Sequence, residues 1–380
     1  MAFKPQEVAE ITVNGMRYRD WESVTVKLAE GESNNTFRLT VSEGKPLRSR
    51  WADMQIRPGD HCSITLAGEL AITGYVETRQ VAYTGEQHGI EIIGVSYTKA
   101  TADGAAMTET QEFRKKPFQQ IAQDTLKPFG IQFKPMSALP NQPFHRASIA
   151  PGQSAWDFLE SLARQRGITL GTDTEGNMTG RTTWMGGGAM LIEGINILEG
   201  REVMTINQGG GPNYADSQHG GTNENFGPKV AHDPTANTKA NVNTGGKGVY
   251  APNKQLAEQP GMKEDVQQRS EFESQQRGAE QLQVTIVVQG WLKPGGGGLW
   301  KPGEKVYVKS PMLIVDEMLD LVSATFTQDD KKGTRTTLEL KRPGGEGDQG
   351  TGGSGEDFSS KTDGSSSSSS GESRSPSLGE

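Results

Sequence analysis

Short runs of alternating apolar and polar residues fill the first hundred positions of the chain. Ile11 to Val13 leads into Asn14-Gly15, a pair typical of two-residue hairpins because both residues tolerate positive φ. Further runs, broken by turn residues, lie at 24–26, 37–41, 62–66, 72–76 and 90–93. Many short strands at such spacing predict a small antiparallel barrel or sandwich. We therefore predict an N-terminal β-barrel-like module over residues 1–103.

The apolar residues take a helical spacing in the next segment. Between Pro117 and Phe129, one helical face carries Phe118, Ile121, Ala122 and Leu126. A second helix is predicted to begin after Ser154, a candidate N-cap, and to stop at Gly167. Residues 173–177 have the composition of a hairpin turn. We predict an inserted α+β module with two helices over residues 104–185.

The strand pattern returns after residue 186, in a second β-barrel-like module predicted over residues 186–342. Strand-like stretches lie at 190–206, 282–288 and 305–340, with a glycine-rich hairpin tip at 295–298. A loop excursion at 208–262 and a connector at 263–280 interrupt this module. The excursion has ten Gly, seven Asn and five Pro but only five residues from the Leu, Ile, Val and Phe set. So few apolar anchors cannot offset the ordering entropy of a separate core, so we expect proteases to cut here first.

Composition adds a tail and excludes one class of function. Residues 343–380 contain 12 Ser and 10 Gly and are predicted to be a disordered linker that folding does not need. This tail carries −5 of the formal net charge of −8, which leaves −3 on the rest of the chain. A nearly neutral body excludes a strongly basic nucleic-acid binder, so no sequence-specific nucleic-acid binding is expected. The predicted fold class is α+β, mainly β.

Two distant stretches of the chain share a pattern. Each starts with Pro, Gly and an acid and continues into a strand, which predicts that one small barrel occurs twice. Chance convergence of two hairpins is the alternative. The matched stretches are 58–64 with 302–308, 70–72 with 319–321 after a five-residue insertion, and 88–89 with 332–333. If the repeat is real, each chain carries two similar β modules.

No catalytic or metal-binding arrangement is found in the sequence. The histidines (His61, His88, His145, His219 and His232) form no H-E-x-x-H motif, and no G-x-S-x-G motif occurs. Glycine triplets at 186–188 and 209–211 lack a following Gly-Lys-Ser/Thr, which favours turns over phosphate binding. Glu91 and Glu193 are possible members of a glycosidase pair, although isolated acids on strands are usually solvated. We therefore assign no catalytic, cofactor-binding or metal-binding residue, and expect no cofactor and no enzyme activity.

The cysteine and the tryptophans are expected to have structural roles. Cys62, the single cysteine, lies in a strand-like run and is predicted to be buried rather than reactive. The tryptophans lie at the edges of predicted elements, where core packing is favoured over stacking on sugars or bases. They are Trp21, Trp51, Trp156, Trp184, Trp291 and Trp300. No signal-peptide pattern and no membrane-spanning run occur, so we expect synthesis in a cytoplasm and no membrane span.

The run from Val13 to Val26 resembles the opening of the Mu-like phage tail protein P family, the baseplate hub proteins of contractile tails. The likeness continues in order over roughly residues 10–342, at 58–60, 70–76, 88–96, 121–131, 156–164, 287–291, 299–302 and 310–313. It implies a structural virion protein, located in the tail baseplate, that forms a homotrimer on the tail axis. Such a hub joins the tail tube to the central spike and nucleates baseplate assembly. The implied partners are further copies of the chain, the spike protein, tube or tube-initiating proteins and other baseplate proteins.

Two other functions remain open from the sequence. The acids and tryptophans on β modules would suit a tail-associated cell-wall hydrolase or a glycan-binding module. Five short strands could also form an OB-type barrel that binds oligosaccharide or nucleic acid. Turnover of peptidoglycan or glycan would favour the first, and salt-dependent DNA binding would favour the second.

Overall fold

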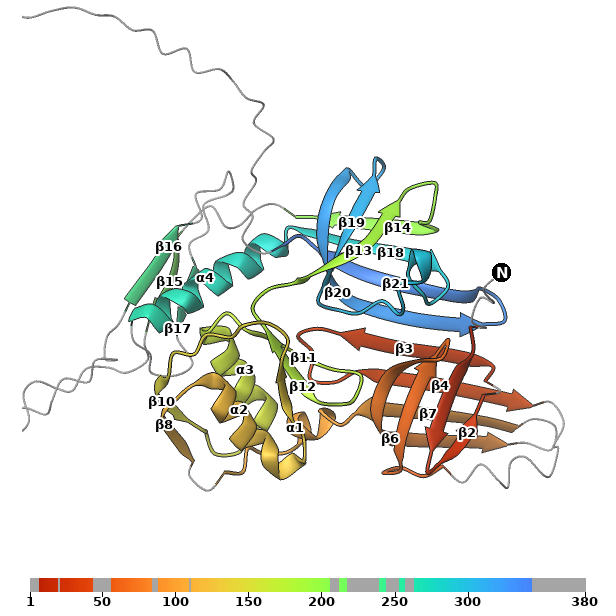
Figure 1. The fold of residues 1–380 in the computed structure, drawn as a ribbon, viewed down its shortest axis with the longest axis horizontal. Coiled ribbons are helices and arrows are strands. Elements are labelled where there is room, and N and C mark those ends of the chain that lie inside the picture. The colour runs from red at the N-terminus through yellow and green to blue at the C-terminus, as the bar shows by residue number, and fades with distance from the viewer. Residues whose placement is uncertain are drawn as a thin grey trace, which may run out of the picture. The chain divides into compact units, whose positions relative to one another are not determined.

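The computed structural model describes residues 7–19, 21–43, 56–83, 88–108, 111–205, 212–216, 239–243, 253–256 and 263–343. Most of its strands belong to one 13-stranded sheet, and nearly all strand pairs are antiparallel (Figure 1). The mainly β, antiparallel fold class predicted from the sequence is confirmed. The tail from residue 344 onward and most of the excursion lie outside the described residues, so the expectations for them remain predictions.

Seven strands form the N-terminal part of the sheet. They are β1 (Ala9–Val13), β2 (Met16–Tyr18), β3 (Ser23–Ala29), β4 (Thr36–Glu43), β5 (His61–Leu66), β6 (Glu69–Tyr83) and β7 (His88–Ser96). Asn14 and Gly15 have φ values of 50° and 81°, and β1 pairs with β2 across them, so the predicted hairpin is confirmed. β1, β3 and β5 alternate buried with less buried residues, which places one face of each strand in the core.

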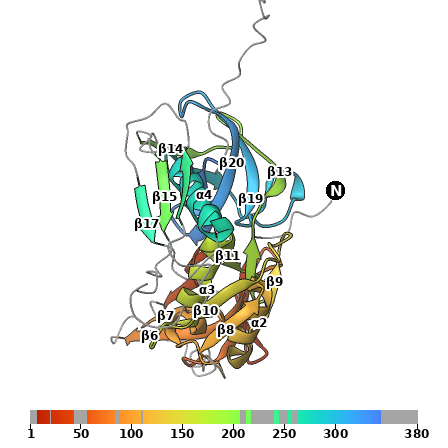
Figure 2. The same cartoon turned by 90° about the vertical axis from the view of Figure 1, so that its left-hand side faces the viewer.

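Three helices and short strands form the middle of the chain, and Figure 2 shows α2 and α3 beside β8, β9 and β10. The elements are α1 (Lys99–Asp103), β8 (Glu112–Lys116), α2 (Phe118–Leu126), η1 (Lys127–Phe129), β9 (Phe133–Pro135), β10 (Phe144–Ser148), α3 (Ala155–Gln165), β11 (Thr169–Thr172) and β12 (Met178–Arg181). Both predicted helices are confirmed: the Ser154 hydroxyl accepts a hydrogen bond from the Asp157 amide at 3.0 Å. Gly130 and Gly167, just beyond the two helical segments, have positive φ. The short helix α1 was not expected.

The C-terminal half differs from expectation at 190–206 and in the excursion. Its elements are β13 (Met185–Ile192), β14 (Glu199–Met204), β15 (Pro212–Asp216), β16 (Lys239–Asn243), β17 (Asn253–Leu256), α4 (Lys263–Ala279), β18 (Leu282–Gln289), η2 (Pro294–Gly296), β19 (Glu304–Ser310), β20 (Val315–Asp329) and β21 (Gly333–Lys341). The stretch 190–206 is two strands rather than one. The expected loop excursion contains a three-stranded sheet, β16-β15-β17, and its strands β15 and β16 contact α4 (Figure 1).

Glycines 186–188 lie in strand β13, so the predicted turn there is wrong. β13 runs parallel to β19, and its register shifts between Gly186 and Met190. A Cβ on Gly187 would lie 2.4 Å from the carbonyl oxygen of Lys305. Gly187 therefore allows two backbones to approach closely, a role that a strand pattern alone does not reveal.

The two β modules, expected as separate units, are hydrogen-bonded into one sheet. β3 pairs with β20 from Ala29 opposite Ser323 to Val24 opposite Gln328. The pairing is possible because β20 is 15 residues long: its first part pairs with β19, and the remainder extends past β19 to reach β3. One hydrophobic core runs through both modules, and a second core fills the α+β module. The described strands form no closed barrel.

Candidate functional site

The two β modules repeat one order of six strands. The order is β1-β5-β6-β7-β4-β3 in the N-terminal module and β13-β19-β20-β21-β18-β14 in the C-terminal module. The corresponding strands also follow one another in the same order along the chain. All corresponding pairs are antiparallel in both modules except the first, because β13 runs parallel to β19 whereas β1 runs antiparallel to β5.

Gly59 and Gly303 mark equivalent points of this repeat. Both have a φ of 90°, and their amides donate to the carbonyls of Val76 at 2.8 Å and Leu321 at 2.9 Å. Directly after each acceptor the ladder to the next strand shifts register, which marks a β-bulge. The match between Pro58-Gly59 and Pro302-Gly303 in the sequence therefore reflects a structural repeat.

The second part of the predicted repeat needs a correction. Leu319 lies opposite Val306, and the equivalent position in the first module, opposite Cys62, is Gly74 rather than Leu70. The sequence match was out of register by four residues, because it assumed a five-residue insertion. The chain from Gly303 to Leu321 is only one residue longer than the chain from Gly59 to Val76.

A buried ion pair ties the α+β module to both β modules. Glu30 follows β3, and its carboxylate lies 2.8 Å from Nε of Arg181, at the end of β12. Arg181 also donates from Nη1 to the carbonyl of Gly303 at 2.9 Å. Burial raises the pKa of Glu30 to about 7, because it outweighs the opposing effect of the Arg181 guanidinium. The sequence analysis missed this pair, since 151 positions separate its members and no motif surrounds them.

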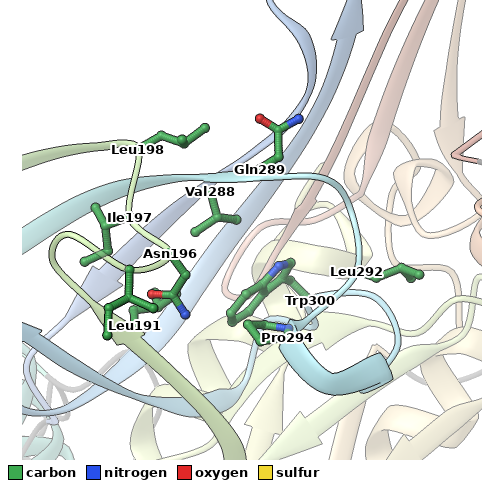
Figure 3. Close-up of a pocket in the computed structure, with 10 residues that line it drawn as sticks. Leu191, Asn196, Ile197, Leu198, Val288, Gln289, Leu292, Pro294 and Trp300 are labelled. Carbon is green, nitrogen blue, oxygen red and sulfur yellow. The ribbon is translucent and has the colours of Figure 1, made fainter. Parts of the chain in front are cut away.

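An apolar cavity of about 250 Å³ opens between the β13–β14 turn and the loop before β19 (Figure 3). Leu191, Ile197 and Trp300 contribute to its lining. Two of its polar side chains are engaged: the Asn196 amide bonds the backbone of Ile192 and Met190, and Gln289 donates to the Thr334 carbonyl. Trp300, another lining residue, has a buried indole nitrogen without a hydrogen-bond partner. One such donor among mainly apolar side chains is not the set of converging polar groups that a small polar substrate needs.

The two acids considered for glycan cleavage each have other partners, in different modules. Glu91 on β7 pairs with Arg38. Glu193, after β13, accepts from the Ser310 hydroxyl at 2.6 Å and from the Met312 amide at 3.1 Å. These two hydrogen bonds hold the pKa of Glu193 below its usual value, which does not suit a general acid.

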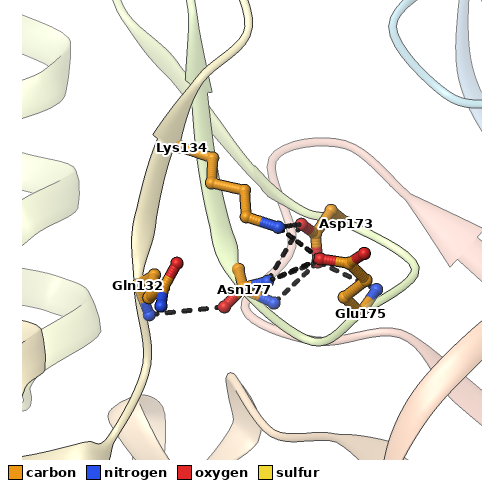
Figure 4. Close-up of polar contacts among 5 residues, drawn as sticks. All are labelled: Gln132, Lys134, Asp173, Glu175 and Asn177. Carbon is orange, nitrogen blue, oxygen red and sulfur yellow. Dashed lines mark hydrogen bonds and ion pairs between the residues drawn. The ribbon is translucent and has the colours of Figure 1, made fainter.

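Asp173 and Glu175 are the two acids of the hairpin turn predicted at 173–177, and the structure forms a hairpin there (Figure 4). The Asp173 carboxylate accepts from the amides of Glu175 at 3.0 Å and Asn177 at 2.7 Å, which closes the predicted turn between β11 and β12. Lys134 on β9 lies 3.0 Å from Asp173 and also pairs with Glu175, so it offsets part of the negative charge of the turn. Among the described residues, no group of His, Cys, Asp and Glu side chains is arranged to hold a metal ion.

The remaining singled-out residues are mostly packing residues. Cys62 is buried on β5 as predicted, and burial raises the pKa of its thiol to about 12. Trp156, Trp291 and Trp300 are buried and Trp21 packs against the core, whereas Trp184 is half-buried and Trp51 lies outside the described residues. His61 contacts the Tyr97 hydroxyl at 2.9 Å. None of the helices in the described ranges has the length and apolar character needed to cross a membrane.

Three family models match the chain in sequence order. Residues 8–96 match the Mu phage baseplate assembly protein GpP-like N-terminal domain, and residues 98–179 match the second domain of the gp44-like baseplate hub proteins. Residues 262–347 match the fourth domain of Mu phage baseplate assembly protein GpP. The matches therefore cover the N-terminal β module, the α+β module, and the part of the C-terminal β module that follows residue 262, without β13 and β14.

Relatives match over nearly the whole chain. The chain is 20% identical over 341 residues to baseplate hub protein gp44 of Escherichia phage Mu, which covers 87% of this chain and 86% of gp44. The prophage MuSo2 43 kDa tail protein from Shewanella oneidensis superimposes with a TM-score of 0.76 at 25% identity, covering 89% of this chain and 99% of that protein. A tail protein from Neisseria meningitidis MC58 has the same fold, with a TM-score of 0.72 at 17% identity and coverage of 88% and 96%.

These matches bear out the family resemblance seen in the sequence, and the repeated β modules supply a structural counterpart to the first and last matched domains. The chain belongs to the family of Mu-like phage baseplate hub proteins.

Proposed function

We propose that three copies of this chain form the hub on the tail axis, where they join the tail tube to the central spike and nucleate baseplate assembly. The baseplate hub role itself follows from the family. The observation that supports the threefold arrangement is the repeat of six strands in two modules of one chain. Three chains with two similar modules each present six similar modules in a ring.

A ring of this kind would meet two different symmetries with one protein. Its six modules would match a tube ring of six subunits on one side, and its three chains would match a trimeric spike on the other. A closed ring also leaves no open-ended surface on which the protein could polymerise. Other baseplate proteins would attach around it.

The proposed role is structural, without catalysis and without sequence-specific nucleic-acid binding. The matched relatives are described as baseplate and tail proteins. The hydrolase alternative loses its support because Glu91 and Glu193 are engaged with separate partners. We also propose the division into 1–103, 104–185, 186–342 and a linker at 343–380, with the modules remaining barrel-like in the assembly.

Two measurements test the proposal. Sedimentation of the purified full chain should give three times the chain mass of 41.0 kDa. In parent tail particles that carry a tag on the chain's C-terminus, electron microscopy should place the tag on the axis, where the tube meets the spike. A stable monomer at high concentration would contradict the trimer. A tag along the sheath, or particles without the chain, would contradict the hub position.

A further inference from the structure

Several strand edges in the described part of the chain lack a partner strand, and two of them belong to β14 and β6 of the repeat. β14 pairs along one edge with β18 and has no strand on the other. β6 pairs with β7 along one edge, but on its other edge the pairing with β5 ends at Tyr75. The described strands therefore leave the backbone groups of residues 77–82 on that edge of β6 without a strand partner. Exposed edges of this kind invite pairing with another chain, and natural proteins usually protect them.

The repeat relates these two edges to a junction that is already formed within the chain. β14 is the counterpart of β3, and β6 is the counterpart of β20. β3 and β20 are the strands that join the two modules to each other. The open edges thus belong to β14 and β6, the counterparts of the two joining strands. Neither of them has the partner strand that its counterpart has within the chain.

The exposure of apolar side chains on these strands also indicates that a partner is missing. Phe326 on β20 is 0% exposed, whereas its counterpart on β6, Val81, is 47% exposed. Leu28 on β3 is 4% exposed, whereas its counterpart on β14, Met204, is 52% exposed. Apolar side chains are therefore left in water at positions that the in-chain junction buries.

We propose that β14 of one copy pairs antiparallel with residues 79–82 of β6 in the next copy, which repeats the β3–β20 junction between chains. The proposal rests on the proposed hub assembly and specifies how its copies are joined. Because one edge binds a different edge, the contact is heterologous, and it closes a ring of three when each contact turns the next copy by a third of a turn about the axis.

The ladders fix the register of this joint. In the N-terminal module, Thr78 on β6 lies opposite Ile93 on β7, which lies opposite Arg38 on β4 and then Thr25 on β3. In the C-terminal module, Ser323 on β20 lies opposite Glu339 on β21, which lies opposite Thr285 on β18 and then Arg201 on β14. Thr78 and Ser323 both follow the bulge of their module. Arg201 is therefore the counterpart of Thr25, which lies opposite Thr327. Ala82 is as far beyond Thr78 as Thr327 is beyond Ser323, so Arg201 of one copy should lie opposite Ala82 of the next.

The same register brings opposite charges together. Val203 falls opposite Gln80, and Glu202 falls opposite Val81 and diagonal to Arg79. Diagonal neighbours across an antiparallel pair are within reach of long side chains. The positions equivalent to Arg79 and Glu202 are Ala324 and Val26, both buried in the in-chain junction. The joint between copies is thus more polar than the one within the chain, as expected for a surface that is exposed before assembly.

Disulfide trapping in the full chain tests this register. Opposite residues in antiparallel strands lie roughly 4.5–5.5 Å apart between Cα atoms, within the range that a disulfide spans. Gln80→Cys with Val203→Cys, or the neighbouring Val81→Cys with Glu202→Cys, should give covalent chain-to-chain products under mild oxidation. The matched control, Gln80→Cys with Glu199→Cys, is out of register by four residues, roughly 13 Å along the strand, and should not cross-link. Each single-cysteine variant controls for Cys62, which is buried.

A charge exchange gives an independent readout. Arg79→Glu or Glu202→Arg alone should weaken association several-fold in sedimentation while the thermal unfolding of the free chain is unchanged. The double variant should restore association, because the opposite charges are again diagonal. Trimers in which neither designed pair cross-links, or in which the control pair cross-links equally well, would overturn this joint and leave the hub trimer standing. A wild-type chain that stays monomeric at every concentration would instead contradict the proposed function.

Discussion

Gly59 and Gly303 occupy equivalent positions, but a side chain at each would meet different surroundings. Both glycines have a φ of 90° and occupy the same point of the repeat. Around a Cβ on Gly59 nothing lies within 4 Å, whereas a Cβ on Gly303 would lie 1.7 Å from Nη1 of Arg181. A side chain at Gly303 must therefore displace the arginine that is paired with buried Glu30.

We predict that Gly303→Ala destabilises the protein more than Gly59→Ala. Both changes impose a left-handed backbone on alanine, which costs roughly 1–2 kcal/mol. Gly303→Ala also separates a buried ion pair, which adds roughly 3–5 kcal/mol when one charge is left without its partner. Urea unfolding of the two variants measures the difference. Equal losses would mean that Arg181 moves aside without leaving Glu30.

Glu30 should make the stability of the protein depend on pH. Its pKa in the folded protein is about 7, raised from 4.5 by burial, so the folded state binds the proton more tightly than the unfolded state. The stabilisation is then fully present below pH 4.5 and is lost as the pH rises to about 7, a loss of about 3 kcal/mol. Glu30→Gln, which keeps the shape and removes the titration, should flatten this part of the curve. Urea unfolding at pH 5 and pH 7.5 measures the free energy of unfolding of both proteins. An equal change in this free energy between the two pH values would exclude Glu30 as the cause.

At the scale of elements, the sequence was most informative where the signal is local. Ser154 and Gly167 mark the two ends of the helix that lies between them in the sequence. Asn14-Gly15 forms its hairpin turn because both residues accept positive φ. The β3–β20 junction has no such signal, because Ala29 and Ser323 come together only in the folded chain. The pairing of Glu30 with Arg181 was missed for the same reason. Strand pairing between distant segments depends on the whole fold rather than on neighbouring residues.

Arg166 fastens helix α4 to the α+β module. Its side chain is 0% exposed, it pairs with Asp265 on α4, and its guanidinium lies 4.2 Å from the centroid of the Phe144 ring. We predict that Asp265→Asn lowers the melting temperature and speeds amide hydrogen exchange in α4, because it removes the counter-charge of a buried arginine.

Glu160→Gln is the control for this variant. It also removes a carboxylate paired with an arginine, Arg164, but that pair is partly exposed on α3 and should contribute only about 0.3–0.5 kcal/mol. Its α4 exchange rates should match those of the unaltered protein. Faster exchange in both variants would show that α4 is held by something other than Arg166.

At the scale of the whole molecule, the repeat explains features that are otherwise unrelated. The two modules have the same strand order, and β3 and β20 join them within the chain. The matching strands β14 and β6 have open edges, so the chain can form the same junction again with the next copy. The sequence indicated this repeat through Pro58-Gly59 and Pro302-Gly303. It did not predict that the modules share a sheet, because the two strands that join them carry no mark distinguishing an edge from an interior strand.

The most direct test is electron cryomicroscopy of the assembled protein at a resolution that separates strands. We predict a threefold ring of six β modules in which β14 of each chain lies beside β6 of the next, with Arg201 opposite Ala82, as Thr25 lies opposite Thr327 within the chain. A ring whose chains meet through other strands would contradict the joint. Chains that do not alternate their two modules around a common axis would contradict the account of the hub itself.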